Sequence, residues 1–388
     1  MARFDSTALT RRSLLARGAT TALGGLLAAC APAAAPAAPP PAAPAAGPAT
    51  KPQWETDWDK MVVAAKQEGA VVVATLAGDG YRKWVESFQQ TFPGVEVRQQ
   101  TFTSGSIWVP KVVEERKGNV FGWDIAMFGA SVVAPPLKPI GGLDPLRPLI
   151  IQRPDVIDDK NWNGGFNAGW QDTNKELGYG LAGRLLLLAV NTDLVQEGEI
   201  KTVEDMLNPK WAGKVVWADV RSGSTFAPMA AVLQGKGRDV VKRLMIDQKP
   251  EFLKDTRQIL EGIVRGKYAF GSGVTKAVLN PFLDQGVGKN IKLLDIPDYT
   301  ILAFSDAIWA LNKAPHPNAA KLFLNWALTK DGQEAGRQFV NWNSRRADVA
   351  GFDANEAPKP GRTYLAVGTE ESAQVTDRAI KVLTDLVG

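Results

Sequence analysis

The stretch of sequence that decides the fold occupies residues 183–193 and reads Gly-Arg-Leu-Leu-Leu-Leu-Ala-Val-Asn-Thr-Asp. Four leucines followed by Ala-Val predict a strand that is buried on both faces. Arg184 precedes this apolar run, and a polar Asn-Thr-Asp follows it. On both sides of the run the chain repeats one pattern: an apolar strand, a small-residue loop and an amphipathic helix. We therefore interpret residues 183–193 as a strand that connects two α/β lobes.

Three strands are predicted before the run, and each is followed by a loop of small residues and a helix. The strands are residues 70–75, 95–102 and 124–128, and the loops after them are residues 76–80, 103–106 and 129–131. This order is typical of a sheet whose strands are largely parallel. Because ligands of open parallel sheets bind beyond the carboxyl ends of the strands, we expect the ligand near these loops.

The chain after the run follows the same order and then returns. Short strands are predicted at residues 214–219, 268–270 and 291–294. Residues 300–312 run back through apolar positions with Asp306 among them, and residues 318–329 form a helix with an apolar stripe. We interpret residues 300–311 as the return crossing between the lobes.

The composition indicates a globular protein and argues against general nucleic-acid binding. The chain has 388 residues, of which 45% are hydrophobic, so it can build two domains. Residues 1–29 contain four arginines and one acidic residue, and they account for +3 of the formal net charge of +4. The charge that remains is too small for a polyanion-binding surface. No stretch after residue 30 has the ~20 apolar residues that a membrane-spanning helix needs.

The amino-terminal residues resemble an export leader. Residues 10–15 read Thr-Arg-Arg-Ser-Leu-Leu, residues 19–29 are small and apolar, and Leu-Ala-Ala precedes Cys30. This order is similar to that of a bacterial lipoprotein signal, whose cysteine becomes the lipidated first residue of the mature chain; a plain secretory signal is the alternative. The arginine pair resembles a twin-arginine (Tat) signal, with a Sec-type leader as the alternative. Residues 30–52, rich in Ala and Pro, predict an extended linker.

Seven short segments follow one another in an order that is typical of one family. They read AAKQEGAVVVATL, FPGVEV, DIAMF, GLAGRLLLLAVNTDL, NPKWAGKVVWADVRSGST, AAKLFLNWALTKDGQEAGRQFV and SRRADV, and they cover most of residues 56–350. In this order they resemble the bacterial extracellular solute-binding proteins of ABC importers, in particular the branch that binds ferric iron, thiamine or phosphonate. Each segment is short, so the resemblance depends on their order and on the lipoprotein-like leader.

The resemblance implies an α/β protein with a periplasmic-binding-protein type II fold, in which two lobes of mainly parallel sheet flanked by helices are joined by hinge strands. Lobe 1 would comprise residues 53–184 and 306–345, and lobe 2 would comprise residues 185–305 and 346–388. A small-molecule ligand would bind between the lobes, and the closed form would dock on an ABC permease with its ATPase. We expect a monomer in the periplasm or on another extracytoplasmic face, anchored to a membrane through a lipid on Cys30, with no cofactor.

The expected ligand contacts lie mainly in loops at strand ends. Helix amino ends expose unpaired N–H groups that suit a carboxylate, phosphonate or carbonate, and arginines add charge-assisted bonds. Caps and tight turns are the alternative role of the Ser and Gly residues. The ligand-binding residues that we predict are Gly78, Ser104, Ser106, Trp108, Arg184, Arg221, Ser222, Ser224, Thr225, Ser272 and Asp306.

Three of these residues have a specific second interpretation. In iron-binding relatives a Gly-Arg pair at the start of this strand lies near the cleft, and Gly183-Arg184 matches that pair; a salt bridge across the lobe boundary is the alternative. Asp306 could bind a ligand amine, cap a hinge or pair with an arginine. Trp108 could stack on an aromatic or cationic ligand, or pack in the core.

Ferric iron is the ligand that the sequence supports least within this branch. The resemblance implies a pair of adjacent tyrosines as hard oxygen donors, at the position where this chain reads Phe-Gly-Ser-Gly over residues 270–273. No two tyrosines are adjacent in the sequence. We therefore predict an organic or oxyanion ligand and no metal, and we keep ferric iron as the alternative.

No group of residues indicates catalysis. One histidine and one cysteine do not provide zinc or haem spacing, and His316 lies between two prolines in a predicted surface turn, without a triad partner. We expect a binding protein and not an enzyme. The alternative to an importer component is a lipoprotein that senses its ligand and feeds a receptor.

Overall fold

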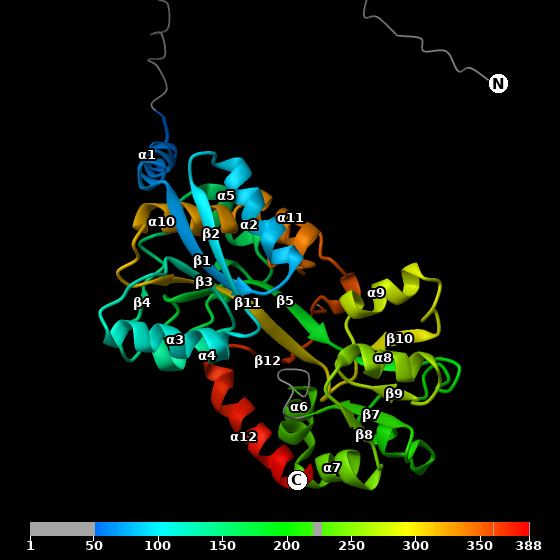
Figure 1. The fold of residues 1–388 in the computed structure, drawn as a ribbon. Coiled ribbons are helices and arrows are strands. Elements are labelled where there is room, and N and C mark those ends of the chain that lie inside the picture. Colours follow the sequence, from blue (N-terminus) through cyan, green and yellow to red (C-terminus); the bar gives the residue numbers. More distant parts are fainter. Residues whose placement is uncertain (1–50, 220–226, 360, 388) are drawn as a thin grey trace, which may run out of the picture. The chain divides into compact units, whose positions relative to one another are not determined.

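The computed structural model describes residues 51–219, 227–359 and 361–387. The predicted leader, the lipidation site Cys30, and the four site residues Arg221, Ser222, Ser224 and Thr225 lie outside the described residues. Within the described part the strands form two sheets, which we call the first and the second sheet (Figure 1). None of the described helices combines the length and the apolar character needed to cross a membrane.

The first sheet has seven strands. Their order is β12-β11-β3-β1-β2, with β4 and β5 also paired to β11. β1 is parallel to β2 and β3, whereas β11 is antiparallel to β3, β4 and β5. The strands are β1 (Ala70–Leu76), β2 (Glu96–Phe102), β3 (Ile125–Met127), β4 (Leu143–Asp144), β5 (Gly178–Leu186), β11 (Ile301–Leu311) and β12 (Leu365–Val367). The three strands predicted before the leucine run are confirmed to within one residue at each end.

The second sheet has five strands in the order β10-β6-β9-β7-β8. β7 is parallel to β8 and β9, and β6 is antiparallel to β9 and β10. The strands are β6 (Leu188–Asn191), β7 (Val215–Ala218), β8 (Glu251–Leu253), β9 (Phe270–Gly271) and β10 (Ile291–Leu294). β10 has the predicted bounds, and β8 is a strand that the sequence analysis did not predict.

The leucine run forms two strands, so the prediction of one continuous strand is wrong. β5 carries Arg184 and ends at Leu186 in the first sheet, and β6 begins at Leu188 in the second sheet. Leu187, between them, is buried. The run divides because a strand that changes sheets must leave one set of backbone partners before it meets the next. The chain returns through β11, whose Ile301 is paired with Leu186, so the two connections lie side by side.

Both sheets are mixed, and not mainly parallel as predicted. The strands that alternate with helices, β3-β1-β2 and β9-β7-β8, give four of the parallel pairs, and β11 with β12 gives another. The antiparallel pairs arise where β5, β6 and β11 join them, because the chain passes from one sheet to the other and back.

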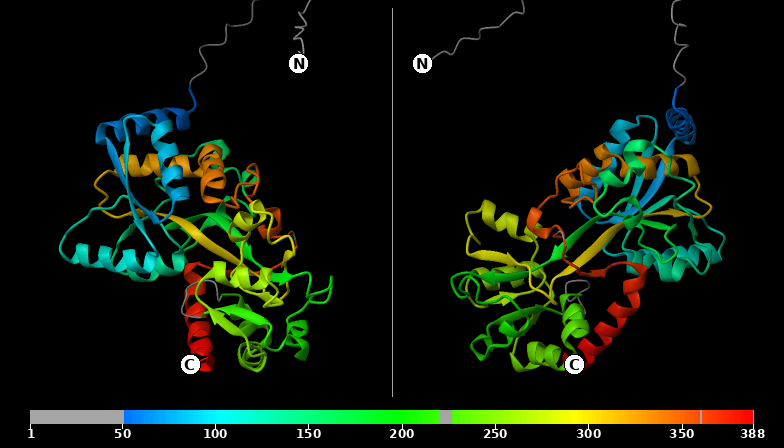
Figure 2. Two further views of the ribbon diagram at one scale, coloured as in Figure 1. Left: turned by 45° about the vertical axis from the view of Figure 1, so that its right-hand side comes forward. Right: turned by 180° about the vertical axis from the view of Figure 1, so that it is seen from behind.

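Helices cover both faces of the first sheet (Figure 2). Val71 and Val73 of β1 pack with residues of α1, α2 and α10 such as Trp84 and Phe323. Val72 and Ala74 contact the opposite layer, which contains α3 and α4. The helices in chain order are α1 (Gln53–Glu68), α2 (Asp79–Thr91), α3 (Gly105–Lys117), α4 (Ala130–Leu137), α5 (Pro154–Ile157), α6 (Ala227–Lys236), α7 (Arg238–Lys242), α8 (Thr256–Val264), α9 (Lys276–Asp284), α10 (Pro317–Leu328), α11 (Lys330–Ala335) and α12 (Glu370–Val387).

The segment after residue 345 contacts both sheets. β12 pairs with β11 in the first sheet. α12 then packs on α4 and α6, and Leu383 is fully buried in the core of the second sheet (Figures 1 and 2). The sequence analysis assigns residues 346–388 as a whole to lobe 2, whereas β12 lies in the first sheet.

Candidate functional site

Three helix amino ends lie along one edge of the first sheet. β1, β2 and β3 are parallel, and a short loop leads from their carboxyl ends into α2, α3 and α4. The residues before these helices are Gly78, Ser104 and Gly129, and among the described residues no side chain caps any of the three. Gly78 has a φ of 144° and faces open space. At the amino end of α4 the N–H of Ser131 donates to the carbonyl of Gly368. The N–H groups at the amino ends of α2 and α3 suit an anionic or hydrogen-bond-accepting ligand.

Two of the predicted serines lie at this edge, whereas Trp108 does not reach it. Ser104 is partly buried, and Ser106 is exposed in the first turn of α3. Trp108 has no exposed surface, and its ring stacks on Phe128 with 5.2 Å between the ring centroids. We therefore withdraw Trp108 from the site: it is a core residue, because the apolar side of α3 turns it inward onto the sheet.

Arg184 is a partly buried arginine that has no hydrogen-bond or ion-pair partner among the described residues. It lies on β5 opposite Ala303 of β11, at the junction of the two sheets. In the described part of the chain no side chain or backbone group forms a hydrogen bond or ion pair with its guanidinium. Gly183 before it packs closely, because a Cβ at that position would lie 2.8 Å from the ring of Phe304. An unpaired guanidinium is suited to bind a carboxylate or phosphonate through two parallel hydrogen bonds.

Asp306 is buried, and its carboxylate accepts a hydrogen bond from the hydroxyl of Tyr81. Burial and the charge of Asp306 raise the pKa of Tyr81, and the charge of Arg184 opposes the shift. Arg184 is therefore close enough to Tyr81 to act on its ionisation. Asp306 positions Tyr81 at the start of α2, beside the open edge. The sequence analysis did not select Tyr81 for this site, although it follows the predicted loop 76–80 directly.

Ser272 uses its side chain inside the second sheet. It is buried, and its hydroxyl oxygen accepts a hydrogen bond from the backbone N–H of Ala218 at 2.9 Å. The hydroxyl therefore ties the end of β9 to the end of β7. The hydroxyl of Ser272 is therefore satisfied within the protein, and its burial does not require a ligand contact.

Glu356 is a buried carboxylate that the sequence analysis missed. It ends a short 3₁₀-helix, residues Ala354–Glu356, and accepts a hydrogen bond from the backbone N–H of Lys276, the first residue of α9. Burial raises the pKa of Glu356, while the Lys276 N–H and the charge of Arg184 lower it. Glu356 thus occupies the amino end of α9 and lies within electrostatic reach of Arg184. The sequence around it, Asp-Ala-Asn-Glu-Ala-Pro, carries no signal for such a role.

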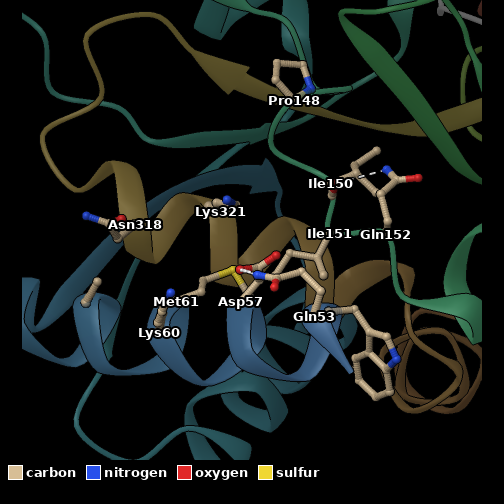
Figure 3. Close-up of a pocket in the computed structure, with 12 residues that line it drawn as sticks. Gln53, Asp57, Lys60, Met61, Pro148, Ile150, Ile151, Gln152, Asn318 and Lys321 are labelled. Carbon is tan, nitrogen blue, oxygen red and sulfur yellow. Dashed lines mark hydrogen bonds between the residues drawn. The ribbon is translucent and has the colours of Figure 1, made fainter. Parts of the chain in front are cut away.

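A groove of about 620 Å³ lies elsewhere on the first sheet's helices (Figure 3). It is lined by side chains of α1 and α10 and by residues 148–152. Lys60, Asp57 and Gln53 come from α1, and Lys321 and Asn318 come from α10. The groove contains none of the predicted site residues.

The tyrosine hydroxyls of the described residues are engaged within the protein or fully enclosed. Those of Tyr179, Tyr268 and Tyr364 donate to Phe166 O, Glu251 and Asp295 respectively. Tyr299 is fully buried. Among the described residues no group of three or more His, Cys, Asp or Glu could hold a metal ion. The prediction that His316 lies in a surface turn without a partner is wrong: His316 is half-buried, and its Nδ1 lies 2.8 Å from Oδ2 of the buried Asp124.

Comparison with known proteins identifies the family. The family described as bacterial extracellular solute-binding protein matches residues 83–342. The chain belongs to this family. The match includes β5, Arg184, β6 and β11, and it ends before the segment that carries Glu356. No curated protein matches this solute-binding protein in sequence.

Solved structures show that this solute-binding protein has the type II periplasmic-binding-protein fold. Iron-bound HitA from Pseudomonas aeruginosa is 16% identical, with a TM-score of 0.60, and the match covers 82% of this chain and 99% of HitA. AfuA from Actinobacillus pleuropneumoniae, with fructose-6-phosphate bound, is 18% identical, with a TM-score of 0.56 and coverages of 82% and 98%. The substrate-binding protein of an ABC transporter from Agrobacterium tumefaciens is 16% identical, with a TM-score of 0.61 and coverages of 83% and 96%.

Proposed function

We propose that this solute-binding protein captures a small organic or oxyanion solute between two lobes and delivers it to an ABC permease with its ATPase. Residues 53–184 and 306–345 form lobe 1, and residues 185–305 form the main part of lobe 2. The observation that carries the proposal is the guanidinium of Arg184, which has no hydrogen-bond or ion-pair partner in the described part of the chain and lies on the strand that leads from one sheet to the other. Closure of the lobes over the ligand supplies the form that the permease recognises.

The charge of the site favours a ligand with a carboxylate, phosphonate or similar oxyanion. Arg184 supplies a fixed positive charge, and the amino ends of α2 and α3 supply N–H groups on the same edge. The ligand contacts that we propose are Gly78, Ser104, Ser106, Tyr81 and Arg184. A partly desolvated guanidinium that gains a bidentate anion makes one of the stronger polar contacts available to a protein.

Two observations favour this ligand class over ferric iron. Four tyrosine hydroxyls donate to acceptors of the same chain, and the fifth is enclosed in the core. The similar proteins bind different ligands, since HitA holds iron and AfuA holds fructose-6-phosphate, so the fold itself does not select iron.

The proposal assigns export and membrane anchoring to the leader and the linker. A signal peptide over residues 1–29, of the twin-arginine type, exports the chain, and a lipid on Cys30 anchors it to a membrane on its extracytoplasmic side. The Ala/Pro-rich linker holds the binding domain off that surface. The protein acts as a monomer without catalysis, nucleic acid or cofactor.

A thermal-shift panel tests the proposed ligand class. Carboxylates, phosphonates, thiamine, polyamines and ferric salts are added separately to the purified protein. A ligand at 100 times its Kd stabilises the folded state by about 2.7 kcal/mol, which raises the Tm measurably. We expect a shift with an oxyanion-bearing solute that disappears in Arg184→Ala. A shift with ferric salt alone, accompanied by tyrosinate colour, would overturn the oxyanion assignment, and no shift with any solute would overturn capture itself.

A further inference from the structure

Two strand connections join the sheets, and further segments of the chain also contact both of them. β5 leads into β6, and the segment after β10 leads into β11. Two connections that lie side by side leave a hinge between two domains. The residues after the family match, from Arg345 onward, add further attachments and alternate between the two sheets.

The first attachment of this segment is to the first sheet. The backbone N–H of Arg345 donates to the carbonyl of Leu181 in β5 at 3.1 Å. Arg346 is fully buried and forms an ion pair with Asp348, and its guanidinium also donates to the carbonyl of Leu328 at the end of α10. These bonds fix the start of the segment on the first sheet's side of the hinge.

The second attachment is to the second sheet, at two points. Glu356 accepts the N–H of Lys276 at the amino end of α9. Asp295, directly after β10, is then contacted through one carboxylate oxygen by three groups: Lys359 Nζ at 2.9 Å, Arg362 Nη1 at 2.7 Å and the hydroxyl of Tyr364 at 3.0 Å. The Asp295 side chain is only 5% exposed, whereas the side chains of Arg362 and Lys359 are 28% and 54% exposed, so the carboxylate is enclosed and its cationic partners lie on the water side.

The third attachment returns to the first sheet. β12 pairs with the start of β11, and the N–H of Ser131 in α4 donates to the carbonyl of Gly368. Glu370 then accepts from Lys138 Nζ at 3.1 Å and from the backbone N–H of Thr173 at 2.8 Å. The amino end of α12 is therefore fastened to α4 and to the loop before β5.

The fourth attachment is apolar and lies on the second sheet. Leu383 is fully buried in a cluster with Leu188, Trp217 and Leu244, and Ile380, Leu386 and Val387 pack against the same cluster. α12 thus has its polar start on the first sheet's side and its apolar end on the second sheet's side, which Figure 1 shows as the red helix passing from α4 to α6.

We propose that the described residues between 345 and 387 form a strap that limits the opening of the two sheets about their hinge, with Asp295 as its main fastening on the second sheet. Each change of side adds a connection that must stretch or break when the sheets separate. A strap of this kind holds the unliganded protein nearer to its closed form, so less reorganisation is needed when a ligand binds.

Distance measurements on the protein without ligand test the strap. Spin labels are attached to Lys83→Cys on α2 and Arg257→Cys on α8, both exposed positions, in the full chain with Cys30→Ser. The distance distribution is compared for the parent, Asp295→Asn and Glu356→Ala. Asp298→Asn serves as the matched control, because it makes the same change three residues along the chain, where the carboxylate pairs with Lys236 and not with the strap.

We expect Asp295→Asn to broaden the distribution and lengthen its mean, Glu356→Ala to do so less, and Asp298→Asn to match the parent. Distributions that match the parent in both strap variants, with circular dichroism melts showing folded proteins, would overturn the strap. If Asp295→Asn does not fold, Glu356→Ala and Lys138→Met decide the question by the same criterion. Because no ligand is present, a failed ligand assignment leaves this test unaffected.

Discussion

The strand ends of the two sheets differ in what occupies them. At the edge of the first sheet, Gly78 faces open space, Ser106 is exposed, and Arg184 nearby has no partner among the described residues. At the described strand ends of the second sheet, Ser272 is bonded to Ala218 and the amino end of α9 is filled by Glu356. The first edge offers unsatisfied polar groups to a solute, whereas the polar groups of the second edge that the structure describes are bonded within the protein. Among the described residues, those of the first edge should therefore contribute most to ligand affinity.

Asp306→Ala should give the largest effect, because Asp306 holds Tyr81 in place at the start of α2, beside the carboxyl ends of the first sheet's parallel strands. The change leaves the partly buried hydroxyl of Tyr81 without its buried acceptor, and we expect a loss of about 3 kcal/mol in the free energy of unfolding. Urea denaturation measures it. Asp79→Ala, a change of an exposed carboxylate in the first turn of α2, should cost less than about 0.5 kcal/mol. Equal losses in the two variants would contradict the buried role of Asp306.

Arg184→Ala should separate ligand binding from stability. We expect the Kd of the solute found in the thermal-shift panel to rise about 100-fold, because a charge-assisted bidentate contact is lost. The free energy of unfolding should change by less than about 0.5 kcal/mol, since the guanidinium has no described partner. Isothermal titration calorimetry and urea denaturation measure the two quantities.

Two further arginine variants sharpen this result. Arg184→Lys should recover only part of the affinity, because an ammonium cannot form the two parallel bonds. Arg82→Ala removes an exposed arginine of α2 that pairs with Glu86, and it should leave the Kd unchanged. If Arg184→Ala unfolds the protein, the residue is structural and the open edge is not the site.

Ser272→Ala tests the strand ends of the second sheet, where the described polar groups are hydrogen-bonded within the protein. Removal of the hydroxyl leaves the buried N–H of Ala218 without an acceptor and should cost about 1 kcal/mol of stability. The Kd for the ligand should stay within twofold of the parent. Ser106→Ala at the other edge should show the reverse pattern, with unchanged stability and weaker binding. A strong loss of affinity in Ser272→Ala would show that the second sheet also contributes to the site.

Glu356→Gln should give the smallest effect, and it should appear as a pH dependence. Burial raises the pKa of Glu356 above its ordinary 4.5, so the folded protein holds this proton more tightly than the unfolded chain does. The stability from this group is present below pH 4.5 and is lost as the pH rises through the raised pKa. The variant does not titrate, so its stability relative to the parent should be more favourable at pH 7 than at pH 4. A constant difference, measured by urea denaturation, would contradict the shift.

The sequence predicted the features that depend on local pattern. The alternation of apolar strand, small loop and amphipathic helix located β1, β2, β3 and β10 closely. Burial on both faces leaves a continuous apolar run in β1 and β3, whereas β2 shows the alternating pattern of a partly exposed strand. The order of the segments also gave the family. The division of the leucine run at Leu187 was not predictable in this way, since a strand in either sheet would show the same leucines.

The features that the sequence did not predict depend on contacts between distant segments. Glu356 reaches α9 across 80 residues, and Tyr81 reaches Asp306 across 225. Neither pair has a spacing that a motif could show. Trp108 was assigned to the site for a related reason. It follows the loop 103–106 closely in the sequence, but the direction of its side chain depends on the packing of α3 on the sheet.

The placement of the tyrosines gives this protein an optical reporter of its own unfolding. Burial raises the pKa of all five phenols, which are Tyr81, Tyr179, Tyr268, Tyr299 and Tyr364. While the chain is folded, phenolate absorbance in the near ultraviolet should stay low at pH values where free tyrosine has already ionised. After a jump to alkaline pH, the part of the signal that comes from the fully buried Tyr179 and Tyr299 should appear at the rate at which the fold opens.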